Sequence, residues 1–231
     1  TVHPMTRRKV PVTIVTGFLG AGKTTLIRHV LATANGRRLA LIVNEFGDLG
    51  VDGAILKSCG IDSCPEENIV ELTNGCLCCT VADDFVPTLD ALLSRKAPPE
   101  HIVIETSGLA LPKPLVKAFD WPEIRARATV DGVVAVIDGP AVAAGRFADD
   151  ADALARQREG DPSLDHENPL EEVFEDQLLA ADLVVLNKTD LMDEPALAAV
   201  EGQVQAILPR AVKFLKTSAG AIPAQVLLGL N

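Results

Sequence analysis

The chain has 231 residues, 48% of them hydrophobic and 23% charged, a composition typical of a globular protein large enough to bury a sizeable core. No run of about 18 apolar residues occurs, and the basic stretch 1–9 lacks the apolar region and cleavage site of a signal peptide, so a membrane protein and a secreted protein are both disfavoured. Most of the net charge of −11 comes from residues 149–176, which hold eleven acidic and two basic residues, and a chain without a basic face is not expected to bind nucleic acid.

The first two predicted elements enclose a phosphate-binding loop. Residues 10–16 are apolar and β-branched, as in a buried parallel strand, and residues 25–31 have the apolar spacing of a helix. The sequence between them has the spacing of a P-loop, in which backbone N–H groups and the helix dipole bind a polyphosphate. In such a loop Lys23 reaches the β- and γ-phosphates and the Thr24 hydroxyl binds Mg²⁺. The residues expected to contact the nucleotide here are Gly17, Gly20, Ala21, Gly22, Lys23, Thr24 and Thr25.

Strands and helices alternate along the rest of the chain. Residues 39–44 predict a buried strand that runs into a glycine- and acid-rich stretch beginning at Glu45, where a P-loop protein carries a first switch loop. Trp121 is expected in the core. Further strands are predicted at 68–72, 102–105, 129–138, 183–187 and 211–216, and further helices at 83–95, 173–181 and 195–208.

This alternation predicts the fold class. Without hairpin turns it indicates an α/β protein, a P-loop NTPase three-layer sandwich whose mostly parallel sheet has helices on both faces. One domain is expected over residues 8–231, with an acidic insertion at 148–172. The apolar stretch 226–231 leads us to expect that a further, C-terminal domain is absent from this chain.

Two motifs at strand ends predict the nucleotide and its magnesium ion. Residues 187–190 read Asn-Lys-Thr-Asp, which resembles the guanine-reading motif of G proteins, with Asn187, Lys188 and Asp190 at its defined positions. An aspartate there accepts hydrogen bonds from the ring N–H and the amino group of guanine, and Ser218-Ala219 resembles the loop that contacts the guanine oxygen. Glu105 is placed as the Walker B acid of the Mg²⁺ shell, and the N–H of Gly108 as a γ-phosphate sensor. Lys23, Thr24 and Glu105 are the expected catalytic residues.

A cluster of cysteines predicts a second metal site. Three of the five cysteines occupy four positions, as Cys76, Cys78 and Cys79, which suits chelation of a soft or borderline divalent ion better than a disulfide framework. Reduced thiols favour a cytoplasmic protein. Glu45 is a candidate oxygen ligand, although a role in the Mg²⁺ shell or in solvent fits it equally well. Cys59 and Cys64 have no assigned role, and His166 is interpreted as a solvated loop residue.

Together these motifs resemble the CobW branch of the metal-insertion GTPases, the P-loop class that includes the HypB and UreG proteins. The resemblance rests on the P-loop, on residues 44–47, on the Gly-Cys-Leu-Cys-Cys stretch at 75–79, on 105–108 and on 187–190. It covers essentially the whole chain except the C-terminal domain usual in the family. Residues 59–68 and 165–170 resemble its cobalamin-pathway members.

The resemblance implies a GTP-dependent metallochaperone that binds Mg²⁺·GTP and delivers Co²⁺ to cobaltochelatase in cobalamin biosynthesis, with hydrolysis to GDP releasing the metal. No residue is placed to orient the attacking water, so slow intrinsic turnover is expected. A metal- or nucleotide-dependent dimer is left open.

Three alternatives remain at this point. The first is a zinc chaperone of the same family that serves another metalloenzyme, because thiolates bind Zn²⁺ at least as readily as Co²⁺ and only the resemblance of residues 59–68 and 165–170 favours cobalt. A small-molecule kinase with a structural zinc is disfavoured by the Asn-Lys-Thr-Asp motif. A G-protein-like regulator would use the acidic insertion as its docking surface.

Overall fold

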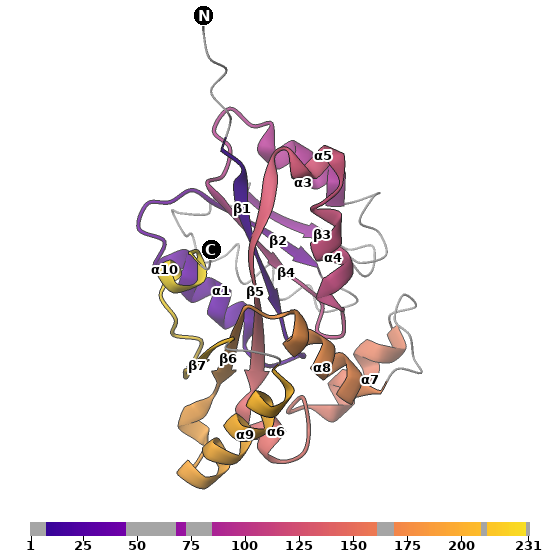
Figure 1. Cartoon of the computed structure of the whole chain (residues 1–231), viewed down its shortest axis with the longest axis vertical. Helices are drawn as coiled ribbons and strands as arrows, with labels where there is room; N and C mark the ends of the chain where they lie inside the picture. Colours follow the sequence, from indigo (N-terminus) through magenta and orange to yellow (C-terminus); the bar gives the residue numbers. More distant parts are fainter. Residues whose placement is uncertain (1–7, 45–67, 73–84, 161–168, 209–211, 230–231) are drawn as a thin grey trace, which may run out of the picture.

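The computed structural model describes residues 8–44, 68–72, 85–160, 169–208 and 212–229, and their strands form one sheet of seven (Figure 1). Every pairing is parallel, and the strand order is β3-β2-β4-β1-β5-β6-β7. The strands are β1 Val10–Thr16, β2 Leu39–Asn44, β3 Ile69–Leu72, β4 His101–Glu105, β5 Ala128–Asp138, β6 Leu183–Asn187 and β7 Lys213–Lys216. The predicted α/β class is confirmed.

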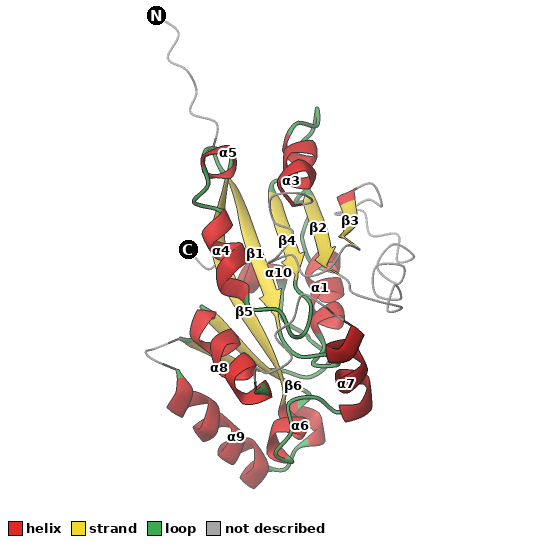
Figure 2. Ribbon diagram, turned by 90° about the vertical axis from the view of Figure 1, so that its right-hand side faces the viewer, coloured by secondary structure: helices red, strands yellow, loops and turns green. Residues whose placement is uncertain are grey.

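Helices cover both faces of the sheet because side chains alternate along each strand. Val103 of β4 lies in the apolar cluster with α1 (Lys23–Ala32) and α10 (Ala224–Leu227), whereas its neighbours Ile102 and Ile104 lie in the opposite cluster. Figure 2 shows α1 and α10 behind the sheet and α4, α8 and α9 on its other side. The helices of this second side are α3 Val86–Leu93, α4 Pro112–Ala118, α5 Pro122–Arg125, α8 Leu170–Ala180 and α9 Glu194–Ile207.

The sheet order brings the expected motifs to one edge. β1 is the central strand, and its residue Val15 pairs with Glu105 of β4 on one side and with Val134 of β5 on the other. The carboxyl ends of parallel strands meet at one edge, where α/β sheets bind ligands. The loop after β1 therefore starts beside Glu105 and beside the end of β5.

Predicted strands and helices agree with the structure to within a few residues, but several short helices were missed. The predicted 83–95 helix is α3, whose Leu89, Leu92 and Leu93 are buried as expected. Helix α6 (Gly139–Ala143) was not predicted, nor was α7 (Ala151–Gly160), which lies within the expected acidic insertion. Apart from Leu154, α7 has no buried residue, so it shows no apolar period.

The prediction that Trp121 belongs to the core is wrong, since the residue is 38% exposed. It precedes the single-turn helix α5, whose buried contact is made by Ile124 instead. In the described part of the chain no helix is long and apolar enough to span a bilayer.

Candidate functional site

The P-loop closes over the end of β1 as the sequence predicts. Gly17 has φ +146°, and a Cβ at this position would lie 2.4 Å from the Val136 carbonyl oxygen of the adjacent strand, so only glycine fits. Lys23 begins α1, is 8% exposed, and its Nζ donates to the Gly17 carbonyl at 2.5 Å. This contact holds the lysine ammonium across the mouth of the loop.

Thr24 and Glu105 bring oxygen atoms together beside Lys23. The Thr24 hydroxyl donates to Glu105 Oε1 at 3.4 Å, joining the first turn of α1 to the end of β4. A hydroxyl and a carboxylate are the hard oxygen donors that Mg²⁺ prefers. The donor set therefore fits the expected Mg²⁺ shell.

The loop after β4 packs directly on the P-loop. A Cβ on Gly108 would come within 2.7 Å of the Leu19 backbone nitrogen, which requires glycine at this approach. Two glutamines from different helices hold the loop. Gln177 of α8 is buried and its Nε2 donates to the Gly108 carbonyl at 2.9 Å, and Gln157 of α7 donates to Ser107 Oγ at 3.4 Å.

The expected base-reading loops lie side by side and are tied to the P-loop by one side chain. Asn187 is 2% exposed; its Nδ2 donates to the Ala21 carbonyl at 2.9 Å and its Oδ1 accepts from the Gly220 N–H at 3.1 Å. The Thr189 N–H donates to the Thr217 carbonyl at 3.1 Å, which fixes residues 187–190 against residues 217–220.

The three remaining predicted base contacts are exposed or half-buried on these loops. Asp190 lies on a 3₁₀ turn (Thr189–Leu191) with its side chain exposed. Ala219 has φ +51° and is exposed, next to half-buried Ser218. The structure thus places these residues on two adjacent loops, outside the lining of the cavity around Lys23.

Lys188 is positioned by a residue that the sequence did not single out. It has φ +61°, and its Nζ forms a 2.6 Å ion pair with Asp138 Oδ2 at the end of β5. Asp138 is buried, and its other oxygen accepts from the Ala141 N–H at 3.0 Å as the cap of α6. Its place as the last residue of a buried strand was the available signal.

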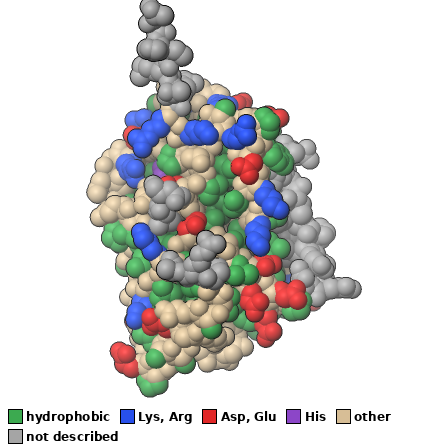
Figure 3. All heavy atoms as spheres, in the orientation of Figure 1, with side chains coloured by type: hydrophobic (Ala, Val, Ile, Leu, Met, Phe, Trp, Pro, Cys, Tyr) green, Lys and Arg blue, Asp and Glu red, His purple; other side chains and the backbone are tan. Residues whose placement is uncertain are grey.

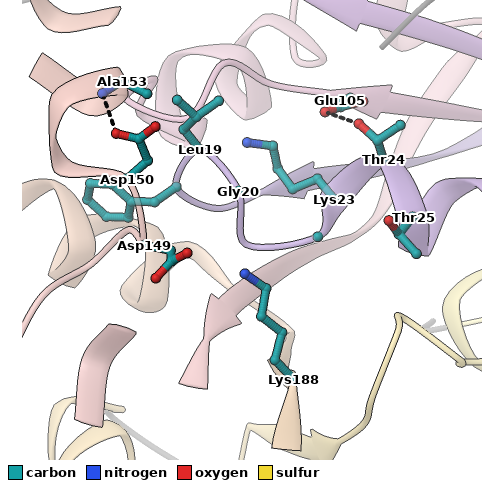
Figure 4. Close-up of a pocket in the computed structure, with 12 residues that line it drawn as sticks. Leu19, Gly20, Lys23, Thr24, Thr25, Glu105, Asp149, Asp150, Ala153 and Lys188 are labelled. Carbon is teal, nitrogen blue, oxygen red and sulfur yellow. Dashed lines mark hydrogen bonds between the residues drawn. The ribbon is translucent and has the colours of Figure 1, made fainter. Parts of the chain in front are cut away.

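The P-loop residues, Glu105 and Lys188 line a cavity of about 450 Å³. Figure 4 shows Lys23, Thr24 and Glu105 on one side of the loop formed by Leu19 and Gly20, and Asp149, Asp150 and Ala153 on the other. Asp150 caps α7 by accepting from the Ala153 N–H at 2.8 Å. The full lining is Phe18, Leu19, Gly20, Gly22, Lys23, Thr24, Thr25, Glu105, Asp149, Asp150, Ala153 and Lys188.

The predicted transition-metal ligands lie outside the described residues. This holds for Glu45, for Cys76, Cys78 and Cys79, and also for Cys59, Cys64 and His166. Within the ranges that the structure describes, no group of three histidine, cysteine or acidic residues could hold a metal ion. The metal site therefore stays a prediction from the sequence.

The sequence is similar to a known protein family and to named relatives. The profile of the CobW/HypB/UreG nucleotide-binding domain matches residues 11–215. The "Zinc chaperone CobW" of a Sinorhizobium species is 60% identical over 96% of this chain, and the protein of that name from Pseudomonas aeruginosa is 59% identical over 98%. The chain spans only 63% and 61% of the length of these relatives.

A solved structure shows the same fold. The Zn(II)-bound triple mutant of the YjiA GTPase superposes with a TM-score of 0.63 at 25% identity, covering 97% of this chain and 62% of that protein.

Proposed function

The chain belongs to the CobW/HypB/UreG nucleotide-binding family, and from that premise we propose that it is a GTP-dependent metallochaperone. It binds Mg²⁺·GTP, hydrolyses it to GDP and phosphate, and delivers a divalent transition metal to a client protein. The observation that carries the proposal is the double hydrogen bond of Asn187, which links the P-loop at Ala21 to the second base loop at Gly220. In our proposal, this link holds the loop that binds the phosphates and the loop that binds the base in a fixed arrangement.

Guanine is the base that the site is proposed to select. The exposed Asp190 carboxylate can accept two hydrogen bonds from guanine, one from the ring N–H and one from the amino group. Adenine does not offer this pair of donors. We expect Asp190→Asn to weaken binding of a fluorescent GTP analogue by roughly tenfold or more, because hydrogen bonds to charged groups contribute about 1.5–3 kcal/mol each. Glu194→Gln, an exposed acid at the start of α9, is the matched control and keeps wild-type affinity. Equal affinity of the wild-type chain for GTP and ATP would contradict guanine selection.

Magnesium is proposed to be held by Thr24 and Glu105. A bound Mg²⁺ would supply positive charge at the β- and γ-phosphates, which Lys23 would also contact. Intrinsic turnover is proposed to be slow and to await a client.

The cargo is proposed to bind at Cys76, Cys78 and Cys79, with Glu45 as an oxygen ligand. Zn²⁺ is the favoured cargo because the two relatives of about 60% identity carry the name zinc chaperone. Co²⁺ delivered to cobaltochelatase is the alternative, which the same thiolates accommodate. The client is a metal-requiring protein of the cytoplasm.

Competition between the two metals tests the cargo. Titration of the Mg²⁺·GTP-bound chain with Zn²⁺ and Co²⁺ against a chelating indicator is expected to give a site that prefers Zn²⁺. The Cys78→Ala/Cys79→Ala variant is expected to lose it, whereas Cys59→Ala keeps it. Unchanged metal affinity in the double variant would refute the site, and preference for Co²⁺ would select the cobalt alternative.

A further inference from the structure

This inference rests on the GTP hydrolysis proposed above and concerns the residue that orients the attacking water. In Ras-like GTPases a glutamine has this role. The residue that follows Gly108 here is Leu109, which is 4% exposed inside an apolar cluster and has no polar atom in its side chain. Among the described residues that line the cavity around Lys23, none carries a carboxamide or an imidazole. A carboxamide that orients the water would therefore have to reach this cavity from its margin.

Gln157 of α7 lies at that margin. Ala153, one helical turn before it on the same face of α7, lines the cavity opposite Lys23. The Gln157 Nε2 donates to Ser107 Oγ at 3.4 Å, and a methyl group built on Gly108 would come within 3.4 Å of its Oε1. The carboxamide thus lies against the loop that also packs on Leu19 of the P-loop.

The acceptor oxygen of Gln157 is uncommitted. Its Oε1 is buried and has no hydrogen-bond partner among the described residues, which is costly unless another group binds there. Of the other amides near the site, Asn187 uses both its nitrogen and its oxygen to bridge Ala21 and Gly220, and Gln177 donates its Nε2 to the Gly108 carbonyl. Among the described residues, the Gln157 Oε1 is the buried side-chain amide oxygen that has no hydrogen-bond partner.

We propose that Gln157 orients the attacking water by accepting a hydrogen bond at Oε1. The terminal torsion of glutamine is soft, so Oε1 can turn toward the cavity while α7 stays in place. The water oxygen then forms a bond to the γ-phosphorus while the bond from that phosphorus to the β–γ bridging oxygen breaks. The electron pair stays on the bridging oxygen of GDP, and both water protons leave with the inorganic phosphate. Gln157 itself exchanges no proton.

The test replaces Gln157 by apolar side chains of similar size. Gln157→Leu and Gln157→Met are close to glutamine in size and remove the acceptor together with the Nε2 donor to Ser107. Gln203→Leu on the exposed face of α9 is the matched control. We expect both Gln157 variants to lower single-turnover phosphate release from bound GTP by about tenfold or more. Affinities for GTP and GDP stay within about twofold of wild type. Binding of GDP with aluminium fluoride, which mimics the transition state, weakens in parallel with the rate.

Each outcome decides the inference. A fall of less than about tenfold in both variants overturns it. A fall matched by an equal loss of GTP affinity also overturns it, because the residue would then act on the fold of the site. If wild-type chain binds GTP and releases no phosphate over a day, the proposed hydrolysis itself fails and this inference falls with it.

Discussion

At the scale of single residues, His101 shows how burial controls charge away from the nucleotide site. It opens β4 with no exposed surface, and one ring nitrogen lies 2.7 Å from Thr13 Oγ1. Burial lowers the pKa of His101 to about 4, because desolvation disfavours the imidazolium; the charge of Asp131 raises the pKa and that of Arg37 lowers it. The histidine is therefore neutral in the folded chain at neutral pH.

This lowered pKa predicts a loss of stability in acid. Because the unfolded histidine protonates near pH 6.5 and the folded one near pH 4, the unfolded chain binds the extra proton between these values. The free energy of unfolding should then fall by up to about 1.4 kcal/mol per pH unit as pH drops through this window. Urea titrations of wild type and His101→Gln at several pH values measure it. Identical slopes for the two proteins would show that another group controls the acid response.

Asn187 is the residue whose loss should cost most at the site. Asn187→Ala leaves the Ala21 carbonyl and the Gly220 N–H without this partner, and the expected destabilisation is about 2–3 kcal/mol. GTP affinity should fall as well, since both loops lose their common anchor. Urea unfolding and nucleotide titration measure the two effects, with exposed Gln205→Ala as the control. A variant as stable as wild type would mean that the bridge is not needed.

The sequence could identify residues with a local motif and missed those defined by tertiary contacts. Lys23, Thr24 and Asn187 stand at fixed spacings after strands, so they could be predicted without coordinates. Gln157 and Asp138 matter through partners that are about 50 residues away in the chain. Gln177 carried one signal, a polar residue on the buried face that α8 otherwise fills with Val173, Phe174 and Leu178.

At the scale of elements, the P-loop is held by aromatic packing as well as by hydrogen bonds. The ring of Phe18 stacks on Phe147 with centroids 5.5 Å apart, and Phe174 of α8 lies 5.0 Å from Phe147. Gln177 on the same helix holds the Gly108 carbonyl. Helix α8 therefore contacts both loops that face the γ-phosphate position in the proposed mechanism.

Figure 3 shows acidic side chains gathered over α7 and α8, where Glu171, Glu172 and Glu175 are exposed.

The close approach of Gly108 to the P-loop predicts a selective loss of GTP binding. Gly108→Ala would place a Cβ 2.7 Å from the Leu19 nitrogen, so one of the two loops must shift. We expect the ratio of GTP to GDP affinity to fall by about tenfold, since the γ-phosphate is bound between these loops in our proposal. Gly202→Ala is the matched control: no atom lies within 4 Å of its Cβ position, and a helical alanine should stabilise α9 by about 0.5–1 kcal/mol. An unchanged ratio in Gly108→Ala would exclude the γ-phosphate contact.

Elements with a clear apolar run or period could be predicted, whereas a helix with almost no buried residue could not. β4 and β6 are buried at every residue and read as continuous apolar runs. Helix α7 buries only Leu154; Asp150 caps its first turn, and Gln157 contacts Ser107 in the loop after β4. Trp121 was assigned to the core by residue type, yet the short α5 leaves it at the surface.

At the scale of the whole molecule, the strand order decides what the nucleotide can control. The central strand β1 carries the P-loop, and its neighbours β4 and β5 carry Glu105 and Asp138 at the same edge. In the chain, the predicted cysteine ligands lie between β3 and α3. Strand β3 is on the same side of the central strand β1 as β4. β4, which carries Glu105, is separated by β2 alone from β3, the strand that precedes the cysteines.

This arrangement leads to a prediction about linkage between metal and nucleotide. If Zn²⁺ binds better to the GTP state, thermodynamic reciprocity requires that Zn²⁺ tighten GTP binding by the same factor, expected here to be about tenfold. Zinc affinity should be measured in Mg²⁺·GTP and in Mg²⁺·GDP, and GTP affinity with and without Zn²⁺. The two ratios should agree in wild type, and both should fall to one in Cys78→Ala/Cys79→Ala while its metal-free GTP affinity stays at the wild-type value. A GTP affinity that ignores zinc would separate the two sites and leave a GTPase that does not gate its metal.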